Sequence, residues 1–179
     1  MSSRFLSIAI LLVVAAVTLA QNHAHTGAKP APPTPAQLAF ERFKKLEGAW
    51  IGKSTKGWEE VVNFKTIAQG SVVVESSFDA HPNETMMTML HMDGDRLTLT
   101  HYCVAKNQPR LAATSFSEDG KTITFTFVDG GNLSSRDRGH MDKALYRFID
   151  DDHFSTQWTW FQDGKERWME EIVLERKGK

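Results

Sequence analysis

Apolar and polar residues alternate with a period of two along almost the whole chain from residue 49 onward. Short alternating runs are typical of β-strands that have one buried and one exposed face. Tight-turn sequences such as Asp93-Gly94 and Asp119-Gly120 separate the runs and favour hairpins. The pattern predicts strands at residues 49–53, 58–66, 71–78, 84–92, 95–103, 110–117, 121–128, 140–149, 153–161 and 165–176.

The connections between these strands are too short to hold a crossover helix, so neighbouring strands must be antiparallel. Strands in simple succession close most readily into an up-and-down barrel, because closure leaves no exposed edge. Before the first strand, residues 36–46 carry apolar side chains at helical spacing, and Gly48 ends the run. The sequence therefore predicts an all-β fold, an up-and-down antiparallel barrel of about ten strands with a short N-terminal helix.

The N-terminal region predicts export. Residues 1–20 have the form of a signal peptide, because Arg4 precedes an apolar run and Thr18-Leu19-Ala20 offers small residues for cleavage. Residues 21–35 are rich in proline and poor in large apolar side chains, which is typical of a disordered linker. Residues 36–179 then form the barrel domain. We expect a secreted or periplasmic protein that has no transmembrane segment once the signal is removed.

Charge and cysteine usage narrow the possible partners. The formal net charge is −1 and no basic cluster is present, which argues against nucleic acid as a partner. Cys103 is the single cysteine, so an internal disulfide is impossible and the fold must rest on its core. The sequence assigns neither a cofactor nor an oligomeric state.

The turn lengths predict which end of the barrel is open. Successive turns of an up-and-down barrel lie at opposite ends, and those at 67–70, 93–94, 118–120 and 150–152 are tight. The other end collects the connections at 54–57, 79–83, 104–109, 129–139 and 162–164, which include the longer ones. Since ligands enter barrels where the loops are long, we expect the second end to be the mouth and the first, beside the helix, to be closed.

Polar and aromatic side chains gather near the predicted mouth. The odd positions of 95–103 form the better interior set, and we expect the even positions of 140–149 to face inward if the turn at 150–152 has three residues. Strand 84–92 stays open between the set of Met86, Thr88 and Leu90 and the set of Met87, Met89 and His91. The residues expected near the mouth are His101, Cys103, Arg110, His140, Asp142, Tyr146, Trp158 and Trp160.

Below these groups the alternation predicts an apolar floor. Two of its members, Phe125 and Phe154, are expected to line a ligand pocket together with Trp158. The whole floor is expected to consist of Leu97, Leu99, Ile123, Phe125, Phe148, Phe154, Ile172 and Leu174.

Several stretches resemble known barrel families. The helix, then Gly48-Ala49-Trp50 on the first strand, then the meander, resembles the lipocalin and fatty-acid-binding branch of the calycin barrels. The stretches MTMLHMDGDRLTLTHYC and DGKERWMEEIVLER are similar to a family of uncharacterised secreted bacterial barrel proteins. The lipocalin resemblance implies that a basic residue near the last strand, Arg176, covers Trp50. Nitrobindin, a haem-binding barrel, is similar in architecture, but its C-terminal haem-ligating histidine has no counterpart in residues 168–176.

Polar groups above an apolar pocket are typical of a small-ligand site. We therefore expect a secreted protein that binds a small, largely apolar ligand with a polar or anionic end, held by His101, Arg110 and His140. The alternatives are an isomerase- or cyclase-type enzyme that uses His101 with Asp142 or Cys103, and a structural envelope protein with a filled barrel. The sequence assigns no catalytic and no metal-ligating residue, and it does not identify the ligand.

Overall fold

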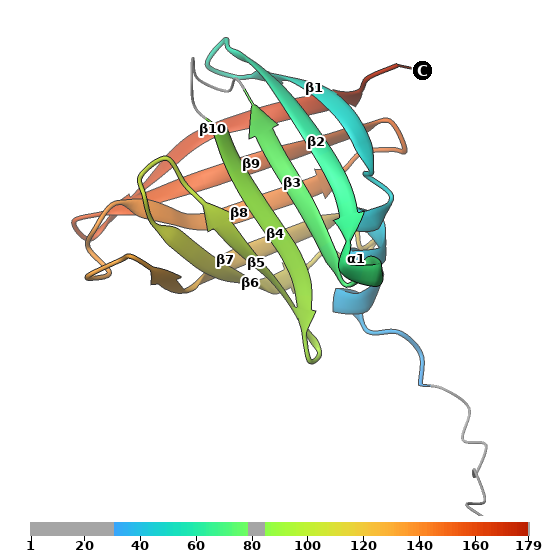
Figure 1. Cartoon of the computed structure of the whole chain (residues 1–179), viewed down its shortest axis with the longest axis horizontal. Helices are drawn as coiled ribbons and strands as arrows, with labels where there is room; N and C mark the ends of the chain where they lie inside the picture. Colours follow the sequence, from blue (N-terminus) through green and yellow to red (C-terminus); the bar gives the residue numbers. More distant parts are fainter. Residues whose placement is uncertain (1–30, 79–84, 179) are drawn as a thin grey trace, which may run out of the picture. The chain divides into compact units, whose positions relative to one another are not determined.

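Ten antiparallel strands close into a barrel in which each strand pairs with its sequence neighbours and β1 pairs with β10 (Figure 1). The computed structural model describes residues 31–78 and 85–178, so the predicted signal peptide and most of the predicted linker lie outside the described residues. The barrel belongs to the unit Pro32–Lys179. The strands are β1 (Gly48–Ser54), β2 (Glu59–Ile67), β3 (Val72–Phe78), β4 (Thr85–Asp93), β5 (Arg96–Tyr102), β6 (Gln108–Phe116), β7 (Thr122–Gly131), β8 (His140–Phe148), β9 (His153–Gln162) and β10 (Lys165–Arg176).

The predicted fold class is confirmed, and the strand boundaries differ from the predicted ones by a few residues at most. A short 3₁₀ turn, η1 (Ala68–Gly70), joins β2 to β3. Within residues 31–78 and 85–178, no helix combines the length and the apolar character that crossing a bilayer demands.

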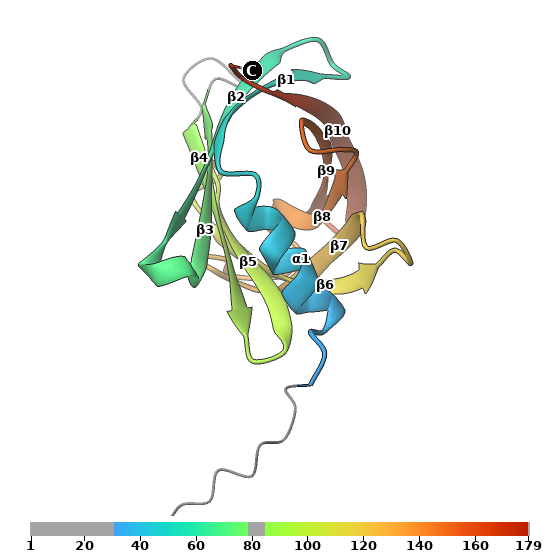
Figure 2. The same cartoon turned by 90° about the vertical axis from the view of Figure 1, so that its right-hand side faces the viewer.

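The helix α1 (Pro35–Lys44) lies across one opening of the barrel (Figure 2). It begins with a capping box, because the Thr34 hydroxyl accepts a hydrogen bond from the Gln37 amide at 3.2 Å and the Gln37 side chain accepts one from the Thr34 amide at 2.8 Å. Its apolar face enters the barrel, where the Phe43 ring makes edge contacts with Tyr146 and Phe148 at centroid distances of 5.1 and 5.2 Å. The helix therefore closes the end that the tight turns predict to be closed.

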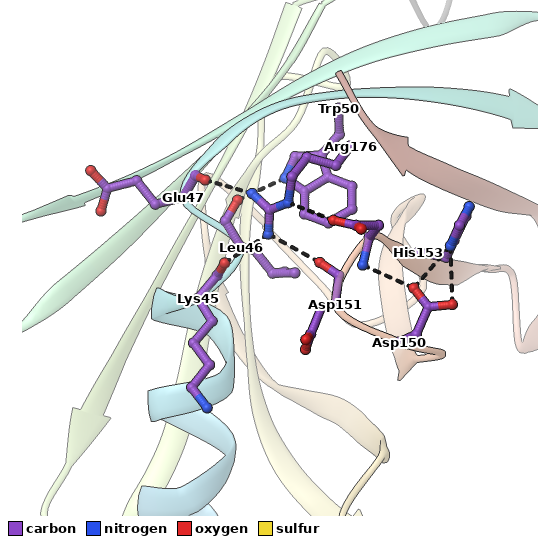
Figure 3. Close-up of polar contacts among 9 residues, drawn as sticks. Lys45, Leu46, Glu47, Trp50, Asp150, Asp151, His153 and Arg176 are labelled. Carbon is purple, nitrogen blue, oxygen red and sulfur yellow. Dashed lines mark hydrogen bonds and ion pairs between the residues drawn. The ribbon is translucent and has the colours of Figure 1, made fainter. Parts of the chain in front are cut away.

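Arg176 covers Trp50 at this closed end, as the lipocalin resemblance implies. The guanidinium carbon lies 4.3 Å from the centroid of the indole, and Trp50 is fully buried. The indole N–H donates to the Leu46 carbonyl at 2.7 Å, and Arg176 donates to the carbonyls of Glu47 and Lys45, each at 2.9 Å (Figure 3). The first strand, the last strand and the end of the helix are thus held together through one side chain.

The predicted apolar floor is the core of the barrel. All eight of its members are buried, and Phe125 and Phe154 are fully buried. The open question about β4 is also settled, because Thr88 and Leu90 are buried and Met86 lines an internal cavity. The set of Met86, Thr88 and Leu90 therefore faces the interior.

Candidate functional site

A cavity of about 350 Å³ lies above the core. Val104 and Ala105 of the β5–β6 connection border it, which places it at the end predicted to be the mouth. Its apolar wall includes Met86, Met141, Trp158, Trp160, Met169 and Ile172. Its polar wall includes Glu60, Glu75, Thr88, His101, Cys103 and Glu170.

His101 sits in a row of cross-strand partners. Register pairs Glu75 with Thr88 and Thr88 with His101, so the three side chains point the same way from β3, β4 and β5. The Thr88 hydroxyl and His101 Nδ1 share a hydrogen bond of 3.0 Å. Nε2 of the same ring is buried and has no hydrogen-bond partner. Nε2 therefore lacks a hydrogen-bond partner whether it carries the proton, as a donor, or the lone pair, as an acceptor.

The surroundings of His101 keep its imidazole neutral. Burial lowers the pKa of His101 to about 4, because the charged form would lose its hydration. The ring lies 4.8 Å from the Trp158 ring, centroid to centroid. His101 therefore presents an uncharged nitrogen beside an aromatic surface at physiological pH.

Two carboxyl groups of the cavity wall hold their protons unusually tightly. Burial raises the pKa of Glu75 to about 8, although the Tyr146 hydroxyl donates a hydrogen bond of 2.6 Å to its Oε2 and thereby favours the ionised form. Burial also raises the pKa of Glu60 to about 7, against a hydrogen bond from Ser77. Near pH 7 the wall consequently contains carboxyl groups that are partly or wholly protonated.

Glu170 is a third buried carboxyl group and faces the cavity from β10. A β-bulge between Trp168 and Glu170 shifts the register, so Glu170 pairs with Trp158 while Trp168 lies half exposed on the outside. The ammonium of Lys56 lies 3.6 Å from Glu170 Oε2, and this oxygen makes no hydrogen bond. The same ammonium lies 5.7 Å from the centroid of the Trp58 ring.

His140 and Asp142 were expected beside His101, and neither of them lines the cavity. A β-bulge between Met141 and Lys143 breaks the alternation of β8, so Met141, paired with Trp160, lines the cavity in their place. Both residues are buried in a separate cluster around Arg136, whose guanidinium contacts Asp142 at 2.5 Å and donates to His140 Nε2. The expected even register therefore fails at the start of β8, where the bulge inserts one residue.

Some of the remaining predicted site residues lie in the cavity wall, and the others lie outside it. Cys103, Trp158 and Trp160 line the cavity with His101, as expected. Tyr146 does not line it but reaches it through its hydrogen bond to Glu75. Arg110 lies on the outer surface, paired with Asp129, because it alternates with the buried Pro109 and Leu111 of β6. Phe125 and Phe154 belong to the packed core below the cavity and not to its wall.

Glu60 and Glu75 were missed by the sequence analysis. Glu60 has the same parity as the buried Val62 and Phe64 of β2, and Glu75 has the same parity as the buried Val73 of β3. A charged residue at an interior position of an alternating strand is the signal that marks them, since such residues are seldom buried without a partner. Within the described segments, no three His, Cys, Asp or Glu side chains are placed to hold a metal ion together.

Gly139 limits where Trp160 can lie, which yields a prediction about the mouth. A Cβ at this position would overlap Cζ2 of Trp160 and approach its Cε2 to 2.9 Å. Gly139→Ala is expected to displace the indole, destabilise the fold by about 1–3 kcal/mol and shift the tryptophan emission spectrum.

The matched control for this change is Gly131→Ala. Its Cβ would meet the flexible end of the Gln108 side chain, which can move aside. Equal free energies of unfolding for the two variants, measured in urea, would contradict the packing argument at Trp160.

Comparison with known proteins assigns no family to this chain. No family model and no curated protein matches the chain. Among solved structures, the chain is similar to a protein of unknown function from the DUF3598 family of Nostoc punctiforme, with 11% identity and a TM-score of 0.44. The match covers 75% of this chain and 48% of the Nostoc chain, so the chain spans about half the length of that protein.

Proposed function

We propose that the protein binds a small, largely apolar molecule that carries one polar group, held in the barrel lumen beside His101 and Trp158. The observation that carries the proposal is the cavity of about 350 Å³, which has an apolar wall of methionine and tryptophan side chains and a few polar groups. The buried, unpartnered Nε2 of His101 supports it, because a ligand group can supply the missing hydrogen bond. A cavity of this size disfavours the alternative of a structural protein with a filled barrel.

The polar end is proposed to be other than anionic. The described residues that line the cavity include no lysine and no arginine. Of the groups expected to hold an anionic end, Arg110 lies outside the barrel, His140 is in a separate cluster and His101 is neutral. An anion would face carboxyl groups in a desolvated pocket, which is unfavourable. We further propose export of the chain, from the signal-like residues 1–20.

The single cysteine provides the test of lumen binding. Cys103 lines the cavity, so an occupied lumen should shield it from a thiol reagent. With octanol as a neutral probe at ten times its dissociation constant, labelling of Cys103 by iodoacetamide is expected to slow about tenfold, because only free protein reacts. Mass spectrometry of the labelled fraction over time measures the rate.

The control moves the thiol to the outer face. In the double variant Cys103→Ser, Tyr102→Cys, the thiol replaces a side chain that is 44% exposed, and its labelling rate should not respond to octanol. A labelling rate of Cys103 that is unchanged at saturating octanol would refute binding in the lumen.

A second candidate is an acid–base enzyme of the isomerase or cyclase type. It is favoured by the opposite protonation behaviour of two groups in one cavity, a neutral His101 and a Glu75 that keeps its proton to about pH 8. Asp142 does not line the cavity, so the partner of His101 in this hypothesis is Cys103 or Glu75. Turnover of a bound natural ligand that is lost in His101→Gln while binding persists would favour this candidate.

A further inference from the structure

We propose that the polar group of the lumen ligand is a protonated amine, bound between the carboxyl groups of Glu60, Glu75 and Glu170 and the ring of Trp158. This inference rests on the proposed function, because it specifies the chemistry of a molecule that must first enter the lumen. It excludes fatty acids and other carboxylates as preferred ligands.

The first support is the imbalance of charge in the cavity wall. Three buried carboxyl groups line one cavity, while the described lining contains no cationic side chain. Buried carboxyl groups are costly unless they are protonated or paired with a cation. The exposed Lys56 reaches Glu170 alone, so a ligand ammonium would supply the cation that the rest of this wall lacks. One nitrogen has enough hydrogens to reach more than one carboxylate.

The second support is Lys56, because its side chain already places an ammonium group beside Glu170. Its ammonium, at the end of an alkyl chain, lies 3.6 Å from Glu170 Oε2 and over the ring of Trp58. The Lys56 side chain is 42% exposed and comes from the β1–β2 connection at the mouth, so it can leave. Lys56 therefore resembles an internal competitor for the site of a ligand amine.

The third support is the aromatic surface that lines the same cavity as the carboxyl groups. Trp158 pairs with Glu170 across β9 and β10, and Trp160 lines the same wall. Indole faces attract ammonium groups, and this attraction strengthens when water is excluded. The neutral His101 adds no opposing charge and offers Nε2 as a further hydrogen-bonding atom.

The raised pKa values of Glu60 and Glu75 predict that the binding of an amine depends on pH. Glu60 and Glu75 have pKa values of about 7 and 8. The titratable groups around them are Glu170 with its partner Lys56, Tyr146, His101 and Cys103. Tyr146, whose pKa is raised well above 10, and His101 stay uncharged in this range. An ammonium favours the ionised carboxyl groups, so its binding must release protons and tighten as the pH rises from about 6 to 8.5.

The experiment compares octylamine, octanol and octanoate, which share one tail and differ in charge. Tryptophan fluorescence titrations at pH 8.5 should give a dissociation constant for octylamine about tenfold or more below that for octanoate. At pH 6 octylamine should bind at least about tenfold more weakly than at pH 8.5, since each linked proton changes the affinity up to tenfold per pH unit. Octanol should bind equally at both pH values.

Two variants move the affinity for octylamine in opposite directions. Glu170→Gln should weaken it about tenfold, and Lys56→Met should strengthen it severalfold by removing the competitor. The matched controls are Glu59→Gln and Lys53→Met, which change exposed charges on the two strands that flank the Lys56 connection and should have no effect. Octanol binding in each variant shows whether its lumen is intact.

The outcomes separate this inference from the proposed function. If octanol binds and octanoate binds as tightly as octylamine, the inference is overturned while lumen binding stands. Weaker octylamine binding in Lys56→Met would also overturn it, because it would make Lys56 a supporting group. If none of the three probes binds or protects Cys103, the proposed function itself fails.

Discussion

Glu75→Gln is expected to stabilise the fold by about 3–5 kcal/mol at pH 9 and to change its stability by less than about 1 kcal/mol at pH 5. Burial raises the pKa of Glu75 from 4.5 to about 8. Between these values the folded state keeps a proton that the unfolded chain has lost, so the free energy of unfolding of the natural protein falls as the pH rises through this window. Glutamine removes the charge and can still accept the hydrogen bond from Tyr146.

Urea denaturation of both proteins at pH values from 5 to 9 measures this effect. His101 does not change the comparison, because both proteins contain it and its lowered pKa of about 4 affects stability only below the ordinary pKa of histidine, where the unfolded chain binds a proton that the fold rejects. Glu166→Gln is the control: its side chain is 47% exposed and pairs with Lys143 on the surface, which contributes less than about 1 kcal/mol. Parallel stability curves for the natural protein and Glu75→Gln would contradict the burial of an ionisable group at this position.

Arg176→Ala is expected to destabilise the fold by about 2–4 kcal/mol. The change removes the hydrogen bonds to the carbonyls of Lys45 and Glu47, an ion pair with Asp152 at 3.4 Å, and the cover over Trp50. The carbonyls at the end of a helix have no partners within it, so losing their donor is costly. Figure 3 shows that these contacts come from the helix end, the first strand and the β8–β9 turn.

Two further variants test the reason for this loss. Arg176→Lys should recover less than half of the stability, because a lysine ammonium has no planar fork to reach two carbonyls while stacking on an indole. Arg96→Ala removes an exposed arginine paired with Asp93 and should cost less than about 1 kcal/mol. Thermal unfolding followed by circular dichroism ranks the three variants, and full rescue by lysine would show that charge alone matters at this position.

The site was predictable only in part, and one reason is a β-bulge in β8. The alternation along β5 and β9 is regular through their interior positions, so His101, Trp158 and Trp160 were placed correctly in the cavity wall. A bulge between Met141 and Lys143 inserts one residue into β8, so the even register that holds from Ala144 to Phe148 does not continue back to the start of the strand. His140 and Asp142 were misplaced for that reason, whereas Arg110 lies outside because it alternates with the buried Leu111.

The all-β class, the antiparallel order of strands, the closing helix and the apolar core could all be predicted from the sequence, because they follow from alternation, short connections and turn residues that act locally. The sequence also placed Arg176 over Trp50, through a resemblance that extends from the first strand to the last. That Glu60 and Glu75 share one cavity with Glu170 and His101 follows only from the three-dimensional fold. Those four residues come from β2, β3, β10 and β5, and the closure of the barrel, together with the register of each bulged pair, is what brings their side chains together.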